Sequence, residues 1–179
     1  MCGACLREPP PLDACFAAVR YAYPWSSLVA RFKFSGEPGW ADALAEHMAL
    51  APGVAEEIGQ CDLVLPLPLA SRRLAERGFN QALLLAQRLA PARTEPRLLL
   101  RLRETGSQAT LDRQARRLNV RHAFGVDPLR IHEVAGRAVL LVDDVMTSGA
   151  SLHAAAQAVR QAGARRVAAL VLARTDEPH

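Results

Sequence analysis

The chain has 179 residues, of which 50% are apolar and 22% are charged, and its formal net charge is +4. This composition suits one domain with a continuous core and excludes a disordered or fibrous protein. No segment approaches the roughly 20 uncharged apolar residues that a membrane-spanning helix needs, so we expect a cytoplasmic protein without a membrane span.

The positive charge comes almost entirely from arginine, because Lys33 is the only lysine. The planar guanidinium group suits phosphate and carboxylate ligands. A biased genomic composition explains the excess equally well, so charge alone does not establish nucleic-acid binding.

The amino terminus carries Cys2 and Cys5 in CxxC spacing, followed by a proline-rich break at 9–11. Two thiolates at this spacing can reach one zinc ion, but tetrahedral zinc takes four ligands, so the pair is half of a site. Cys15 and Cys61 lie in apolar sequence surroundings, and we expect both to be small buried side chains.

The next segment predicts a strand and two helices. The apolar run 14–23 indicates the strand. After Pro24, apolar residues recur at the spacing of an amphipathic helix; they are Trp25, Leu28, Val29 and Phe32. Residues 35–39 end this helix, and 40–50 predict a second one.

From residue 62 onward, apolar strands alternate with helices. Helices are predicted at 79–90 and in the segment that ends at Gly163, and 104–120 is polar and weakly helical. The predicted strands are 62–65, 97–102, 139–142 and 167–172. This alternation predicts an α/β fold with a mainly parallel central sheet flanked by helices, in which ligands collect beyond the carboxyl ends of the strands.

The most informative segment is 142–151, where a buried strand runs through two acids into a small, hydroxyl-rich turn and a helix. A helix amino terminus favours a phosphate group, because its amides are free and its dipole is positive. Gly149 lets the backbone approach the phosphate, and the hydroxyls of Thr147, Ser148 and Ser151 add donors.

The two acids are Asp143 and Asp144. Placed about one ribose length from the phosphate, their carboxylates can accept hydrogen bonds from vicinal hydroxyls and can help to hold magnesium, directly or through water. The alternative is a solvated strand end followed by an ordinary helix cap. A cap does not require a strand, two acids, a hydroxyl-rich turn and a helix in immediate succession, so we favour a binding site.

This segment resembles the signature of type I phosphoribosyltransferases, and the chain from about residue 2 to residue 174 resembles the ComF family. Two further stretches resemble ComF: 65–81, from LPLP to RGFNQ, and 107–124, from SQ to RHAF. The resemblance implies a type I phosphoribosyltransferase fold with three parts. These are a remnant of a zinc-ribbon module at 1–12, a small hood at 13–60 and the phosphoribosyltransferase core at 61–179.

ComF relatives usually open with two CxxC pairs, and Cys2 with Cys5 resembles the second pair. Three explanations remain open for the missing pair. Either the protein has lost its zinc, or the true start lies upstream, or, less favoured, a homodimer shares one pair from each chain.

The resemblance also implies a ligand, 5-phosphoribosyl-1-pyrophosphate with magnesium. Asp143 and Asp144 would bind the ribose hydroxyls as catalytic residues. The 5-phosphate would lie against Thr147, Ser148, Gly149, Ala150 and Ser151.

The loop after Leu65 would be the pyrophosphate loop, with Arg72, Arg73 and Arg77 close to the diphosphate. Guanidinium groups and magnesium would stabilise the departing pyrophosphate while charge develops at the anomeric carbon. Arg72 and Arg73 have an alternative interpretation as charges on a helix surface.

Residues 103–121 stand where the family has a mobile loop over the reaction centre, although an ordinary exposed helix fits equally well. Some relatives place a lysine in this loop; here its catalytic role would fall to Arg103 or Arg113. Purine-salvage relatives carry an acid at the position of Thr147, so a general acid or base is missing there.

Two functions follow. The first is a glycosyltransferase that moves the phosphoribosyl group to an unknown acceptor, within the DNA uptake and natural transformation with which ComF proteins are associated. The second is a non-catalytic accessory that binds single-stranded DNA and competence proteins, in which the donor site is a sensor or a relic.

The helical spacing of the aromatic residues favours core packing over a stacking surface for bases; these residues are Trp25, Phe32, Phe34 and Trp40.

Overall fold

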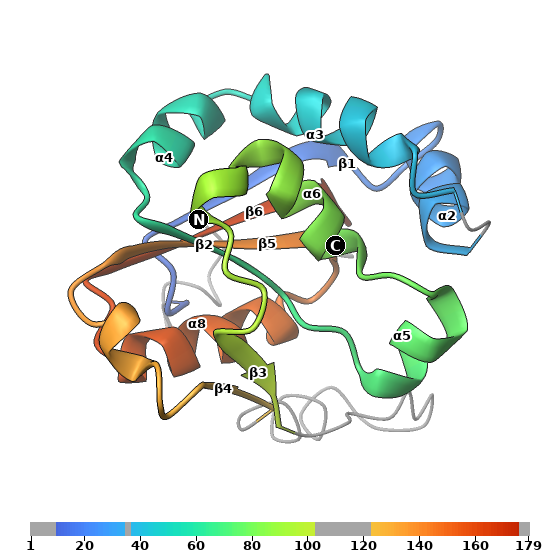
Figure 1. The fold of residues 1–179 in the computed structure, drawn as a ribbon. Helices are drawn as coiled ribbons and strands as arrows, with labels where there is room; N and C mark the ends of the chain where they lie inside the picture. The colour runs from blue at the N-terminus through green and yellow to red at the C-terminus, as the bar shows by residue number, and fades with distance from the viewer. Residues whose placement is uncertain (1–9, 35–36, 103–122, 176–179) are drawn as a thin grey trace.

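In a computed structural model, the structure describes residues 10–34, 37–102 and 123–175 (Figure 1). In chain order the elements are β1 (Ala14–Arg20), α2 (Trp25–Phe34), α3 (Trp40–Ala49), α4 (Val54–Gln60), β2 (Leu63–Pro66), α5 (Ser71–Arg77), α6 (Gln81–Leu89), η1 (Pro91–Arg93), β3 (Leu99–Arg101), β4 (Phe124–Val126), η2 (Ile131–Glu133), β5 (Ala138–Met146), α8 (Ala150–Gln161) and β6 (Arg166–Arg174). None of the helices in these ranges is both long and apolar enough to cross a membrane.

Four strands form one sheet in the order β1-β6-β5-β2, and every neighbouring pair is parallel. The central strands β5 and β6 stay in register from the pair Ala138 and Arg166 to the pair Met146 and Arg174. β3 and β4 form a separate antiparallel ribbon. The predicted α/β fold with a mainly parallel central sheet is confirmed.

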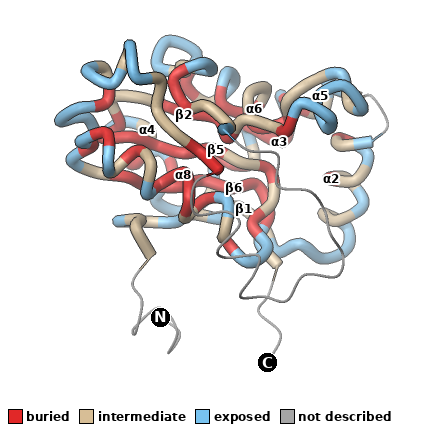
Figure 2. The backbone as a smooth tube through the Cα atoms, turned by 90° about the horizontal axis from the view of Figure 1, so that it is seen from below, coloured by how far each residue is buried: buried red, intermediate tan, exposed pale blue. Residues whose placement is uncertain are grey.

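Helices cover both faces of the sheet (Figure 1): α3, α4 and α6 lie on one face, and α8 with the β3–β4 ribbon lies on the other. Because side chains alternate along a strand, β5 contributes to both cores. Leu140 and Val142 pack on the α3 and α6 side, whereas Val139 and Leu141 pack on the α8 side. Both faces of β5 and β6 are buried, which explains why the sequences of these strands contain continuous apolar runs (Figure 2).

Several elements differ from the sequence predictions. β1 falls in the range that we predicted for the hood, yet it pairs with β6 in the central sheet; the predicted domain boundaries themselves stay predictions. The strand predicted at 97–102 is β3, which joins the ribbon and not the sheet. The two short helices α4 and α5 were not predicted, because seven residues are too few to show a helical period.

Side-chain burial also corrects two expectations. Cys61 is buried as predicted, but Cys15 is exposed because β1 is an edge strand. Among the aromatic residues expected in the core, Phe32 is fully buried, whereas Phe34 at the end of α2 is 72% exposed. In α6 the buried face includes Gln81, because this helix packs against both β5 and α3.

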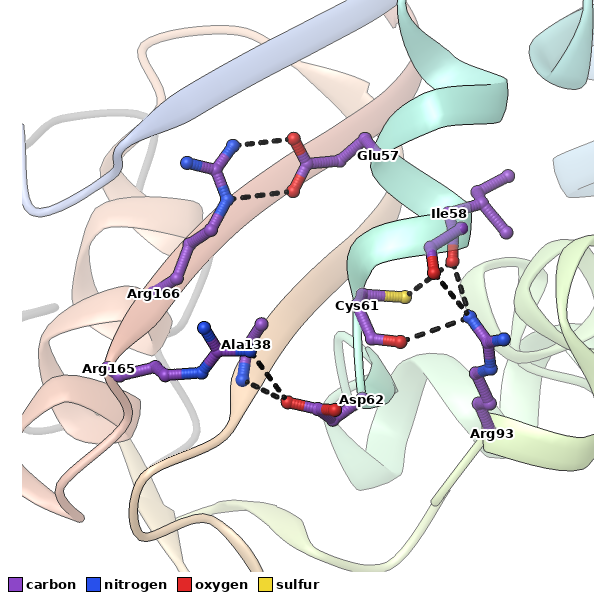
Figure 3. Close-up of polar contacts among 9 residues, drawn as sticks. Glu57, Ile58, Cys61, Asp62, Arg93, Ala138, Arg165 and Arg166 are labelled. Carbon is purple, nitrogen blue, oxygen red and sulfur yellow. Dashed lines mark hydrogen bonds and ion pairs between the residues drawn. The ribbon is translucent and has the colours of Figure 1, made fainter.

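Ion pairs connect the chain segments at the amino-terminal edge of the sheet (Figure 3). Glu57 of α4 accepts hydrogen bonds of 2.6 and 3.2 Å from Arg166 of β6. Asp62, just before β2, accepts a hydrogen bond of 2.8 Å from the backbone of Ala138 and one of 3.4 Å from Arg165. These contacts fix α4 and β2 to the starts of the two central strands.

Candidate functional site

The two acids of the predicted site lie inside a strand and not in the turn that follows it. The sequence predicted a strand over 139–142, but β5 continues to Met146 because its whole length pairs with β6. Asp143 and Asp144 are therefore held by the sheet at its carboxyl edge. Successive side chains of a strand point to opposite faces, so the Cα–Cβ bonds of the two acids are directed to different faces of the sheet.

Asp144 lies on the α2, α3 and α6 side of the sheet and forms an ion pair that sequence reasoning missed. The ammonium of Lys33, at the end of α2, is 3.0 Å from its Oδ1 atom. The side chains are 16% exposed for Lys33 and 10% for Asp144, so both charges are largely removed from water. Such a buried carboxylate needs a partner, and Lys33 supplies it.

Asp143 lies beside this pair in a different electrostatic environment. Its Oδ1 atom accepts a hydrogen bond of 2.8 Å from the backbone of Asp144. Loss of hydration and the neighbouring charge of Asp144 raise the pKa of Asp143 to about 7, against the opposing charges of Lys33 and Arg101. A carboxyl group poised near neutrality at a strand end is typical of a functional site.

The turn between β5 and α8 depends on Gly149. Its φ of 74° is in the left-handed region, and an added Cβ would lie 2.6 Å from the Cε atom of Met146 and 3.2 Å from the Nε2 atom of His153. Only glycine fits this position without rearrangement. The turn leads into the twelve residues of α8, whose first amides have no partners within the helix and so favour an anion.

The other residues predicted for the phosphate lie around this glycine. Thr147, Ser148 and Ser151 are exposed, so their hydroxyls are accessible to a ligand, and Ala150 is half-buried at the first position of α8. These placements are compatible with the predicted contacts, which stay predictions.

The loop after β2 runs beside the carboxyl end of β5. The backbone of Leu67 donates a hydrogen bond of 2.9 Å to the carbonyl of Val142, just before the acids. The side chain of Asn80 donates one of 3.0 Å to the carbonyl of Leu67 and caps α6 by accepting from the backbone of Ala82. The predicted pyrophosphate loop is thus fixed next to the acids at one end and to α6 at the other.

The three arginines predicted near the diphosphate have different environments. Arg72 lies on the surface of α5 with its side chain 83% exposed and pairs with Glu76 at 2.8 Å, and Arg73 is exposed on the same helix. Arg77 is half-buried and donates a hydrogen bond of 3.0 Å to the Oε1 atom of Gln81. Arg77 therefore has a fixed side chain, whereas Arg72 and Arg73 fit the alternative of helix-surface charges as well as phosphate contact.

A hollow of about 650 Å³ opens between the loop after β2 and the β3–β4 ribbon. It is lined by Pro68, Leu69, Ser71, Pro96, Arg97, Leu99, Leu100, Arg101, Leu102 and Asp127. It does not include the two acids, but Arg101 connects the two regions. Its guanidinium group is 3.5 Å from the carbonyl oxygen of Pro68, and its charge opposes the rise in the pKa of Asp143. The hollow is thus bordered by the predicted pyrophosphate loop but does not reach the two acids.

The predicted metals are magnesium at the two acids and zinc at the amino terminus. Within the described ranges, no three His, Cys, Asp or Glu side chains gather as metal ligands. Magnesium that arrives with phosphates takes only one or two protein carboxylates, so Asp143 and Asp144 suit an ion that a diphosphate brings. Cys2 and Cys5 lie outside the described residues, as does Arg103, and their predicted roles stay predictions.

Sequence reasoning missed Lys33 and Arg101 because each reaches the acids from a distant segment. Lys33 is the only lysine of an arginine-rich chain and ends an amphipathic helix, which was the one available signal. Arg101 follows the apolar residues of β3 without a motif of its own.

Comparison with known families finds the phosphoribosyl transferase domain over residues 75–179. Competence protein F of Haemophilus influenzae is 35% identical over 180 residues, which cover 97% of this chain and 78% of that protein. The DNA utilization protein YhgH of Escherichia coli O6:H1 is 34% identical with the same coverage of both chains. Competence protein ComFC of Bacillus subtilis is 31% identical over 135 residues, which cover 75% of this chain and 53% of that protein.

Proposed function

The chain belongs to the ComF family of proteins with a phosphoribosyl transferase domain, and from that premise we propose that it binds 5-phosphoribosyl-1-pyrophosphate at the carboxyl edge of β5. One observation carries the proposal: β5 places two acids, Asp143 half-buried and Asp144 buried, directly before a turn that only glycine fits, at the start of a long helix. A sugar phosphate is the ligand that uses all of these features, because its phosphate suits the helix amides and its hydroxyls suit the carboxylates.

In this proposal each part of the donor has its own segment. The 5-phosphate binds to the turn 147–151, and the ribose hydroxyls donate hydrogen bonds to Asp143 and Asp144. The diphosphate lies along the loop after β2, with Arg77 as the arginine whose side chain is already fixed. Magnesium comes with the diphosphate, adds positive charge to it, and is held by one or two carboxylates.

The reaction that this geometry suits is phosphoribosyl transfer. The bond between the anomeric carbon and pyrophosphate breaks, a bond to an acceptor nucleophile forms on the opposite face, and pyrophosphate leaves with the electron pair. Positive charges beside the diphosphate stabilise the leaving group. Thr147 offers no general acid or base at its position, so the acceptor must be nucleophilic without help from that residue.

Thermal denaturation tests donor binding. At a hundredfold excess over its Kd, the donor with magnesium stabilises the folded state by about 2.7 kcal/mol, which raises the Tm by roughly 5–10 °C for a chain of this size. Asp144→Ala is expected to abolish the rise. Asp42→Ala is the matched control, because Asp42 is an exposed acid paired with Arg88 on α6 and should keep the full rise. No rise in the native protein would refute the proposal.

Single-stranded DNA is the second candidate ligand, favoured by an exposed aromatic side chain next to arginines. Phe34 is 72% exposed, and the guanidinium carbon of Arg77 lies 5.0 Å from the centre of its ring. Arg72 and Arg73 extend the basic surface along α5. Aromatic rings stack on bases, and arginines bind the phosphate backbone. The names of the relatives, which refer to DNA utilization and competence, support a role of this kind in DNA uptake.

Titration of a fluorescent single-stranded oligonucleotide tests the second candidate. Binding is expected to weaken steeply as salt rises, because each phosphate contact releases counterions. Replacing both Arg72 and Arg73 by alanine should weaken binding and reduce the salt dependence, while Arg165→Ala at the opposite edge of the sheet should change neither. Binding that is indifferent to salt and to both sets of changes would exclude this surface.

A further inference from the structure

The ion pair between Lys33 and Asp144 connects the helix that covers the carboxyl edge with the strand that carries the acids. The ammonium lies 3.0 Å from the Oδ1 atom of Asp144. Lys33 therefore pairs with one oxygen of the carboxylate, whose second acceptor is the Oδ2 atom. Since the carboxylate is largely desolvated, the lysine supplies a counter-charge for it and restricts its rotation.

The residues on either side of Lys33 fix the end of α2 in place. The ring of Phe32 is fully buried, and its centre lies 5.9 Å from that of Phe79. Phe34 lies below the guanidinium group of Arg77 at 5.0 Å. Both partners belong to the RGFNQ stretch 77–81, which joins the end of α5 to the start of α6. The backbone that carries Lys33 is thus packed against the segment next to the proposed diphosphate loop.

We propose that Lys33 is a positioning residue of the donor site, which holds one oxygen of Asp144 so that the other accepts a hydroxyl of the ribose. The inference rests on the proposed function, because it concerns the same donor. Lysine suits the role, since a point charge on a flexible stem can reach a strand from a neighbouring helix. The lysine acts on the sugar through Asp144 and has no role toward the diphosphate.

Because Lys33 is proposed to act on the sugar and not on the diphosphate, its removal should weaken the binding of some ligands and not of others. Ribose 5-phosphate and 5-phosphoribosyl-1-pyrophosphate both carry the hydroxyls that Asp144 would accept, whereas inorganic pyrophosphate carries none. Loss of a hydrogen bond to a charged group typically weakens binding about ten- to a hundredfold. Sugar-containing ligands should lose this factor when Lys33 is removed, and pyrophosphate should not.

The experiment is calorimetry with these three ligands and magnesium on Lys33→Met and Lys33→Gln. Methionine removes the charge at similar length, and glutamine keeps a hydrogen-bond donor without the charge, so that one variant remains informative if the other does not fold. We expect both to bind the two sugar phosphates about tenfold or more weakly and to bind pyrophosphate like the native protein. Lys33→Arg should recover most of the lost affinity.

Arg31→Met is the matched control, because Arg31 lies on the same helix in an exposed ion pair with Glu37 and should bind all three ligands normally. If the Lys33 variants bind the sugar phosphates as tightly as the native protein does, Lys33 has no positioning role. If they lose pyrophosphate to the same extent, its role is only structural. If the native protein binds no sugar phosphate at all, the proposed function fails and this inference fails with it.

Discussion

The two edges of the parallel sheet surround their acids with different groups. At the amino-terminal edge, the backbone of Ala138 and the side chain of Arg165 lower the pKa of Asp62 (Figure 3). At the carboxyl edge, loss of hydration and the charge of Asp144 raise the pKa of Asp143 to about 7. The first arrangement favours the ionised acid in the folded state, whereas the second disfavours it. One edge is thus built for stability, whereas the other retains unfavourable electrostatics, as functional sites often do.

The largest expected effect comes from breaking the ion pair between Glu57 and Arg166 at the amino-terminal edge. Glu57 is 6% exposed, so Arg166→Met leaves a buried carboxylate without its partner while keeping the apolar stem. We expect a loss of about 2–3 kcal/mol in the free energy of unfolding, measured by urea denaturation. Arg165→Met, in an exposed pair with Asp62, should cost less than about 1 kcal/mol. Equal losses would contradict the structural role of the buried pair.

A second prediction uses the pKa of Asp143. The folded state keeps this proton to about pH 7, whereas the unfolded chain loses it near 3.8, so the free energy of unfolding should fall as the pH rises between these values. Asp143→Asn removes this dependence. At about 1.36 kcal/mol per pKa unit the full shift would be worth roughly 4 kcal/mol, but water screens this half-buried carboxyl. The variant should therefore gain about 1–2 kcal/mol over the native protein at pH 8 without divalent ions. A native protein that becomes more stable over this pH range relative to the variant would show that Asp143 is favourably ionised.

The smallest effect on the free energy of unfolding is expected at Asp62, where removing the carboxylate destabilises the protein and does not stabilise it. Its hydrogen bond from the backbone of Ala138 lowers its pKa, so its contribution is present above the ordinary pKa and is lost as the pH falls through the lowered value. Asp62→Asn should therefore cost less than about 1 kcal/mol at pH 7 and nothing in strong acid. Thermal unfolding between pH 2 and pH 7 measures this. If the stability difference between the native protein and Asp62→Asn grew in acid, Asp62 and Asp143 would not affect the pH dependence of stability in opposite directions.

Prediction from sequence found the central strands and α8, although it ended β5 four residues early. β5, β6 and α8 are covered on their packing faces by apolar side chains, so their patterns follow directly from burial. It found the strand β1 but not its place in the central sheet, and it missed α4 and α5. β1 is an edge strand whose partner β6 is distant in the sequence, and the two helices are too short to show a period.

For the candidate site, local sequence determined the order of strand, acids, glycine turn and helix, because neighbouring residues build that segment by themselves. It could not show that Lys33 would reach Asp144, or that Arg101 would act on Asp143, since both contacts depend on how α2 and β3 pack against the carboxyl edge. The charge balance around the acids was therefore decided by tertiary structure. Electrostatic interactions depend on distance and burial, and neither can be read from the spacing of residues along the chain.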